Sequence, residues 1–350
     1  MKTALALILT AVALLYWSSD RLSQPIFDEQ LETPPADAFA VAPLKQALTL
    51  ARTRDGRVLL VTSASGEGVS AVDLNANLPR AYRDAREAFA HLGFGLLENL
   101  VRHSHLMVRV PWADLDTPLA APAQHIAAGT NYSSHAQEVG HEGEPFLFPK
   151  LSAATPWDAA VTDGARLDYE VELCATPMQD YRPGESVQLG YLLCNDFTDR
   201  WLLVRDIDLD GPMGLTGFAL GKGGATRMPV GPLLVIPRDE AFFATLELSL
   251  YVDGQLRQRA SAGDMIWSPL DVLRRALVDC NTAYDLDGEP VRLVDCDRIA
   301  AGTMLLTGTP GGVMFKPATL WAPWAYLRPG QTVQSFGTYL GALSNEIVTP

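Results

Sequence analysis

Short apolar runs and alternating apolar and polar positions dominate the second half of the chain. Strand-like segments cover residues 166–175, 186–196, 231–237, 244–258, 303–308 and 331–337. Side chains alternate across a strand, so this pattern predicts a sheet-rich region. Asp253-Gly254 lies inside one of these segments, and an Asp-Gly pair between apolar runs predicts a β-hairpin.

Helical periodicity is confined to fewer segments. Residues 81–101 carry apolar side chains at helical spacing and follow the strand-like residues 57–64. Residues 268–280 predict another helix, with Ser268 as its N-cap before Pro269. The strands follow one another too closely for a βαβ series, so the pattern predicts a β-rich α+β fold.

The N-terminal segment differs from the rest of the chain. Residues 3–17 are uncharged and mostly apolar, a run that is short for a membrane span, which needs about 17 residues or more. Bulky Tyr16 and Trp17 stand where a cleavage site needs small residues, which favours an uncleaved anchor over a removed signal. Residues 1–19 are therefore predicted to be a signal-anchor or signal peptide.

The rest of the chain is predicted to form a linker and two domains. Residues 20–42 are acidic and contain prolines, as a tether does. A small N-terminal α/β domain is expected over residues 43–125 and a larger β-rich domain over residues 126–350. The lysine before the apolar run predicts that the chain after this run is exported. We therefore expect a membrane-anchored protein with an extracytoplasmic (periplasmic) domain, or a secreted one, rather than a cytoplasmic one.

Composition narrows the classes of partner. The 350-residue chain is 48% hydrophobic and carries a net charge of −14. Nucleic acid is excluded as a partner, because phosphate binding needs a basic surface. An anionic substrate would have to be bound by a few placed cations or by a metal.

The four cysteines do not predict a zinc cluster, because none of them has C-x-x-C spacing. Disulfides are permitted outside the cytoplasm. Cys280 and Cys296 flank a polar loop and are the better pair. For Cys174 and Cys194, buried free thiols and a disulfide both stay open.

Three carboxylates form a candidate metal site. Glu170 and Glu172 alternate with apolar residues and point to the same side of the predicted strand. Asp196 ends the segment 186–196 and joins them if the two strands pair. Adjacent like charges repel unless a cation lies between them, and an all-oxygen site suits Mg²⁺, Mn²⁺ or Ca²⁺. The alternative for the two glutamates alone is a solvated strand face.

His135 and Glu138 are a candidate general base and its orienting group. They stand three residues apart, so they are neighbours on a helix, and a carboxylate fixes the tautomer of an imidazole. A surface ion pair is the alternative. Lys150 ends an apolar run, where it could partner an oxyanion or carboxylate; a stem that snorkels to solvent is the alternative.

Taken together and in order, six segments resemble the motifs of the fumarylacetoacetate hydrolase family. They are NYSSHAQE (131–138), FLFPK (146–150), DYEVEL (168–173), NDFTDR (195–200), GKGGATRMPVGP (221–232) and LLTGTPGGV (305–313). The resemblance extends over more than half of the chain. Trp201 stands where the family usually has aspartate after arginine, and residues 223–225 stand where it usually has Ser-Phe-Asp. These replacements argue against a common family substrate.

The resemblance implies a fold, a site and a reaction. The fold is a mixed β-sandwich or β-roll catalytic domain, often in a homodimer. The implied metal ligands are Glu170, Glu172 and Asp196, the implied catalytic residues are His135, Glu138 and Lys150, and the implied substrate contacts are Arg200, Lys222 and Thr309. The expected cofactor is Mg²⁺, or Mn²⁺ or Ca²⁺ in its place.

The implied reaction is cleavage of a C–C bond in a small 2-oxo or 1,3-diketo acid through a metal-stabilised enolate, with His135 and Glu138 activating water. The same site could serve a hydratase, decarboxylase or isomerase of an oxo acid. A non-catalytic, membrane-tethered binding protein is the alternative of another class.

Overall fold

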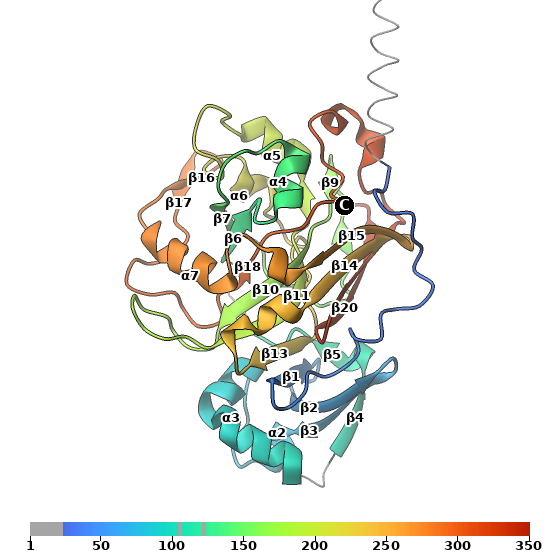
Figure 1. The fold of residues 1–350 in the computed structure, drawn as a ribbon, viewed down its shortest axis with the longest axis vertical. Helices are drawn as coiled ribbons and strands as arrows, with labels where there is room; N and C mark the ends of the chain where they lie inside the picture. Colours follow the sequence, from blue (N-terminus) through green and yellow to red (C-terminus); the bar gives the residue numbers. More distant parts are fainter. Residues whose placement is uncertain (1–23, 104–106, 121–123) are drawn as a thin grey trace, which may run out of the picture.

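Fully buried strands form the centre of the fold. Every residue of β10 (Val171–Pro177), β11 (Leu189–Asn195) and β13 (Leu233–Pro237) is buried. Strands that are covered on both faces read as near-continuous apolar runs, as these do. The computed structural model describes residues 24–103, 107–120 and 124–350, and it places the three strands side by side in an 11-stranded sheet (Figure 1).

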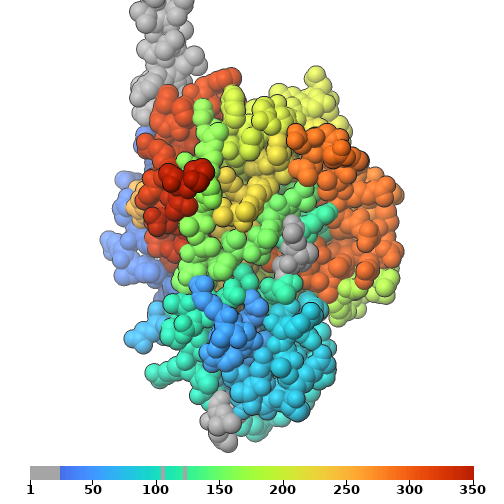
Figure 2. Space-filling view, turned by 180° about the vertical axis from the view of Figure 1, so that it is seen from behind, coloured from blue at the N-terminus to red at the C-terminus, as the bar shows by residue number. Residues whose placement is uncertain are grey.

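This large sheet takes in strands from both predicted domains. Its order is β4-β3-β2-β1-β13-β11-β10-β18-β6-β7, and β5 pairs with β1. Its other strands are β1 (Ala47–Thr53), β2 (Val58–Ser65), β3 (Gly68–Asp73), β4 (Met107–Pro111), β5 (Leu115–Asp116), β6 (His125–Gly129), β7 (Phe146–Lys150) and β18 (Leu305–Leu306). Because β1 pairs with β13, the N-terminal strands continue the sheet that contains the core. They form one end of the molecule, blue and cyan in Figure 1 and Figure 2. The domain boundary at residue 125 stays a prediction.

A second sheet of five strands has the order β15-β14-β19-β20-β8. Its strands are β8 (Val161–Thr162), β14 (Glu247–Val252), β15 (Gln255–Ser261), β19 (Thr332–Gly337) and β20 (Gly341–Val348). Asp253 and Gly254 both have positive φ, as the tight turn of a hairpin requires, so the predicted hairpin is confirmed. Two small pairs complete the strands: β9 (Leu167–Asp168) with β12 (Thr198–Asp199), and β16 (Tyr284–Leu286) with β17 (Glu289–Val291). The predicted β-rich α+β class is confirmed.

Few helices accompany the sheets. In the described part of the chain the α-helices are α2 (Leu74–Asn77), α3 (Ala85–His103), α4 (Ser133–Val139), α5 (Arg200–Asp206), α6 (Phe218–Gly221) and α7 (Pro269–Val278). Short 3-10 helices are η1 (Trp112–Asp114), η2 (Glu240–Thr245), η3 (Ala262–Asp264), η4 (Thr319–Trp321) and η5 (Pro323–Ala325). Ser268 and Asp271 form a capping box at α7, which confirms the predicted N-cap. Both predicted helices are present, although Gly93 interrupts α3 with a φ of 65°.

The predicted strand over residues 166–175 is broken, which corrects the sequence-based expectation. Tyr169 and Glu170 lie between β9 and β10. Side chains take over the hydrogen bonds there: the Asn195 side-chain oxygen accepts from the Glu170 N–H at 2.9 Å. The Gln258 side-chain oxygen accepts from the Val171 N–H at 3.0 Å. Side-chain acceptors satisfy these two backbone N–H groups without a partner strand, so the regular strand is interrupted next to the candidate metal ligands.

Both possible disulfides are formed. Cys280 pairs with Cys296, as the sequence favours. Cys174 of β10 pairs with Cys194 of β11, so the alternative of free thiols for these two is wrong. Their Cα atoms are 5.8 Å apart, a separation that neighbouring strands supply and a disulfide requires. This bond links β10, which carries Glu172, with β11, which is followed directly by Asp196.

The predicted anchor over residues 1–19 lies outside the described residues. Among the residues that the structure does describe, no helix is both long enough and apolar enough to cross a bilayer. The anchor and the extracytoplasmic location therefore stay predictions.

The buried Cys174–Cys194 bond yields a prediction about stability. Replacing both cysteines with alanine should lower the free energy of unfolding by about 2–4 kcal/mol, because the bond closes a loop of 20 residues in the unfolded chain. Urea unfolding measures the loss, and the Cys280→Ala/Cys296→Ala variant, with a loop of 16 residues, is the matched control. Reactive thiols in the denatured, unreduced parent protein would contradict the pairing.

Candidate active site

Pairing of β10 with β11 brings three carboxylates together. Val171 lies opposite Asn195, so Glu170 and Asp196 adjoin where the pair ends, and the Asp196 N–H donates to the Glu170 carbonyl at 2.9 Å. One carboxylate oxygen from each of Glu170, Glu172 and Asp196 lies within 4.8 Å of the others. All three side chains are buried. The solvated-face alternative for the two glutamates is therefore wrong.

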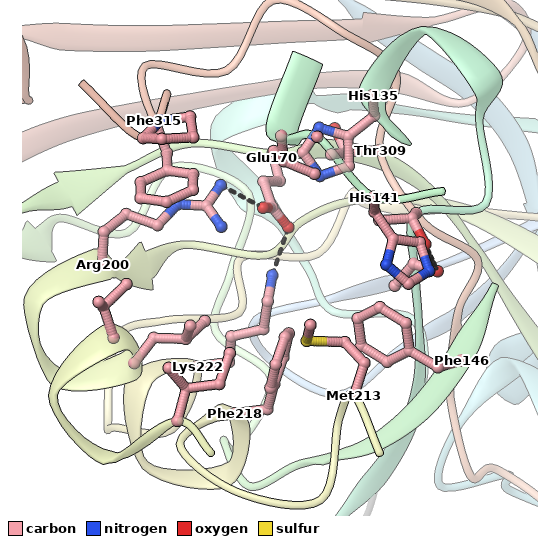
Figure 3. A pocket seen from close by; sticks show the side chains of 18 of the residues that line it. His135, His141, Phe146, Glu170, Arg200, Met213, Phe218, Lys222, Thr309 and Phe315 are labelled. Atoms are coloured by element: carbon pink, nitrogen blue, oxygen red, sulfur yellow. Dashed lines mark hydrogen bonds and ion pairs between the residues drawn. The ribbon is translucent and has the colours of Figure 1, made fainter. Parts of the chain in front are cut away.

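Cationic side chains surround this carboxylate cluster. Arg200, the first residue of α5, donates to Glu170 at 2.5 Å and to Asp168 at 2.9 Å. Lys222, at the end of α6, donates to Glu170 and, at 2.7 Å, to Asp196. Burial alone raises the pKa of Glu170, but the charges of Lys222 and Arg200 outweigh it and hold this pKa well below its usual range. Figure 3 shows Arg200 and Lys222 reaching the Glu170 carboxylate from two different directions.

Lys150 contacts the cluster from within the protein. Its ammonium lies 2.6 Å from the second Asp196 oxygen and donates to the carbonyls of Lys222 at 2.5 Å and Arg227 at 2.9 Å. It is fully buried, and it is not among the described residues that line the cavity at the site. Its contact is thus with a protein carboxylate, which excludes the snorkelling alternative; a direct catalytic role stays a prediction.

Glu172 is the carboxylate that lacks a cation. One of its oxygens accepts from the Gly308 N–H at 2.8 Å, and in the described part of the chain it makes no ion pair. Burial, together with the charges of Asp196 and Glu170, raises its pKa well above the usual range. A buried carboxylate is costly without a positive partner.

With all of its carboxyl groups ionised, the buried cluster has an excess of negative charge. It holds four carboxylates and three cations: Asp168, Glu170, Glu172, Asp196, Lys150, Arg200 and Lys222. The donor set consists of carboxylate oxygens, which hard divalent cations prefer. The residues present therefore fit a Mg²⁺, Mn²⁺ or Ca²⁺ ion, which would supply the positive partner that Glu172 lacks.

The His135–Glu138 pair lies on α4, and His135 lines the same cavity as Glu170 of the carboxylate cluster. His135 Nδ1 is 3.5 Å from a Glu138 oxygen, and both residues are largely buried, so the alternative of a surface pair is wrong. Glu138 also accepts from the Gly312 N–H at 3.1 Å and from Lys316. Burial raises the pKa of Glu138, but the hydrogen bond of His135 and the charge of Lys316 outweigh it and lower this pKa overall. Glu138 is thus held as a carboxylate that can orient the imidazole.

A cavity of about 400 Å³ lies between the His135–Glu138 pair and the carboxylate cluster. His135, Glu170, Arg200, Lys222 and Thr309 all line it. These residues come from separate elements, and their convergence places an imidazole, one carboxylate of the cluster and two cations around one space.

Two further residues complete the site, although neither was predicted from the sequence. Asp168 shares the face of Glu170 and Glu172, so the same alternation could have indicated it; its carboxylate pairs with Arg200. Lys316 stands 178 residues from Glu138 and lies outside the six motifs, so no spacing indicated it. Thr309 donates to the Val171 carbonyl at 2.9 Å and accepts from Gln258 at 2.8 Å, which fixes its position in the wall.

Comparisons with known proteins agree with this arrangement. The model of the fumarylacetoacetate (FAA) hydrolase C-terminal domain matches residues 124–348. Oxaloacetate tautomerase YisK of Bacillus subtilis is 28% identical over 249 residues, which is 67% of this chain and 72% of that protein. The mitochondrial oxaloacetate tautomerase FAHD2B of Bos taurus is 26% identical over 301 residues, 81% of this chain and 86% of the relative.

Among solved structures, maleylpyruvate hydrolase from Sphingobium sp. SYK-6, in complex with manganese (II) ion and pyruvate, has the same fold. Its TM-score is 0.57 at 21% identity, and the match covers 86% of this chain and 99% of the other. The family model matches more than half of the chain, over the segment that contains every residue of the site. The chain therefore belongs to the fumarylacetoacetate hydrolase family.

Proposed function

We propose that this protein is a divalent-metal-dependent enzyme that converts a 2-oxo acid through its enol form. The observation that carries the proposal is the shared cavity. It is lined both by Glu170, one of three buried carboxylates within 4.8 Å of one another, and by His135, whose ring lies beside the buried Glu138 carboxylate. The relatives named as oxaloacetate tautomerases support a 2-oxo acid as the substrate class.

The proposed metal ligands are Glu170, Glu172 and Asp196. A divalent ion held there would polarise the 2-oxo group and stabilise negative charge on its oxygen. Arg200 and Lys222 line the cavity beside these ligands and would attract the carboxylate of the substrate.

His135 is the proposed base. With Nδ1–H donating to Glu138, the Nε2 lone pair is the proton acceptor. In tautomerisation, Nε2 takes the proton from the carbon beside the 2-oxo group, and the C–H electron pair becomes the C=C bond of an enolate. The imidazolium then gives the same proton to the enolate oxygen, which yields the enol and restores the neutral imidazole. Glu138 stabilises the imidazolium that forms between these steps. Lys316 and the Gly312 N–H hold Glu138 in place.

Cleavage of a C–C bond in a 1,3-diketo acid is the second candidate reaction. The same imidazole could take a proton from water. The cavity of about 400 Å³ has room for water beside a small acid, since one water molecule occupies ~30 Å³. Tautomerisation moves protons only, whereas cleavage consumes water and releases two products. Product analysis by NMR therefore separates the two reactions, and also detects hydration or decarboxylation.

The metal assignment predicts the behaviour of Glu172→Gln. A metal at about 100 times its Kd stabilises the parent protein by about 2.7 kcal/mol. The variant should lose this stabilisation by Mn²⁺ or Mg²⁺, while its metal-free melting temperature stays the same or rises, because a neutral amide replaces an unpaired buried carboxyl. Glu170 is a less suitable probe, because its loss would leave buried Arg200 and Lys222 partly unpaired. Differential scanning fluorimetry measures the shift.

The exposed Glu289→Gln on β17 is the matched control for this measurement. It should keep the full metal-dependent shift. A full shift in Glu172→Gln as well would contradict the metal assignment.

The base assignment predicts that His135→Ala lowers kcat by about 10²–10⁴-fold, the usual contribution of a general base. The metal-dependent shift should persist, because His135 is not a proposed ligand. Tautomerisation of oxaloacetate and cleavage of acylpyruvates would be followed with Mn²⁺ present, and the exposed His103→Ala is the control. Equal turnover in His135→Ala and the parent would remove His135 from the mechanism. Metal binding without turnover of any oxo acid by the parent would support the binding-protein alternative.

The contact between Lys316 and Glu138 predicts a pH-dependent effect on stability. The pKa of Glu138 is lowered on folding, so its contribution is complete above the unfolded value of 4.5 and is lost as the pH falls through the lowered value. Lys316→Met should therefore lower the free energy of unfolding at pH 7 by about 1.5–3 kcal/mol, and by less near the acid limit of folding. Urea unfolding over a pH series measures this. A loss that is independent of pH would contradict the ion pair.

A further inference from the structure

We infer that the cavity selects a 2-oxo acid with a single carboxylate and an apolar far end, rather than a dicarboxylate. This inference rests on the proposed function, since it takes the charged end of the cavity as the place of the 2-oxo acid group. It goes further by assigning a substrate class to the rest of the cavity. This class differs from oxaloacetate, the dicarboxylate for which the relatives are named.

The cavity has two chemically distinct halves. The charged half contains Glu170, Arg200 and Lys222. The other half is lined by Phe146 of β7, Phe218 of α6, Met213, and Leu203, Val204 and Ile207 on or next to α5. Figure 3 shows Met213, Phe146 and Phe218 close together on the side of the cavity away from Arg200. We name these six residues the apolar wall.

Helix α5 joins the two halves. Arg200, Leu203, Val204 and Ile207 follow the spacing i, i+3, i+4, i+7, which places them along one helical face. That face begins with the guanidinium that contacts Glu170 and continues with aliphatic side chains only. At 1.5 Å per residue it extends about 10 Å. The helix therefore provides a charged end for the acid group and an apolar track that leads away from it.

A second substrate carboxylate would find no free cation in this half. Among the described residues that line the cavity, Arg200 and Lys222 are the only arginine and lysine, and each already contacts two buried carboxylates. His141 also lines the cavity and contacts the wall. Its Nε2 lies 3.0 Å from the Glu144 carbonyl, and its ring packs edge-on against Phe146. Burying a carboxylate against these side chains is costly, whereas burying an apolar group is favourable.

The test compares two stable ligands that differ only at the far end. 5-Methyl-2-oxohexanoate and 2-oxopentanedioate share the 2-oxo acid group and the next two carbons, and they end in an isopropyl group or a carboxylate. Isothermal titration of the Mn²⁺-loaded protein should give a Kd at least tenfold lower for the isopropyl compound. Equal affinity, or tighter binding of the dicarboxylate, would overturn the inference.

Met213→Arg adds a cation to the half-buried edge of the apolar wall. It should weaken binding of the isopropyl compound by about tenfold or more and strengthen binding of the dicarboxylate. Val278→Arg, at a position 80% exposed on α7, is the matched control and should change neither Kd. If Met213→Arg also changes neither, the assignment of the apolar wall is overturned. Because these are binding constants, they test the inference even if turnover fails and the proposed reaction has to be abandoned.

Discussion

Neutralisation of buried charge is the constraint on which the rest of this structure depends. Glu170 and Asp196 are buried, one just before β10 and the other just after β11, and Lys222 bridges them with one ammonium group. An unpaired charge there would cost several kcal/mol, so each carboxylate needs a partner held at a fixed place. Arg200 and Lys150 meet this need from α5 and β7, which ties those elements to the central strands. Folding and assembly of the site are thus one event.

The same constraint explains why the site is polar at one end only. Arg200 and Lys222 are held at the end of the cavity where they pair with Glu170, and most of the remaining lining is aliphatic or aromatic. Glu172 is the exception, since it is buried with a single backbone donor and an elevated pKa. A dication would supply the positive partner that Glu172 lacks. A metal held there would place the proposed chemistry at the boundary between the charged and apolar halves of the cavity.

Local patterns predicted much of this arrangement, and long-range contacts account for what they missed. Alternation placed Glu170 and Glu172 on one face, and a second apolar segment brought in Asp196; the six motifs then indicated the family. The break beside Glu170 was not predicted, because side chains distant in sequence supply its hydrogen bonds. Lys316 was missed for the same reason. The i, i+3, i+4, i+7 spacing of the apolar residues on α5 is present in the sequence, but only the fold shows that this face lines the cavity.

The central claim is that three carboxylates, one just before β10, one on β10 and one just after β11, share one divalent ion. Anomalous diffraction from crystals of the Mn²⁺-loaded protein at the manganese absorption edge tests it most directly. We predict a single strong peak at bonding distance from an oxygen of each of Glu170, Glu172 and Asp196. A peak elsewhere on the chain, or none at these carboxylates under saturating Mn²⁺, would contradict it.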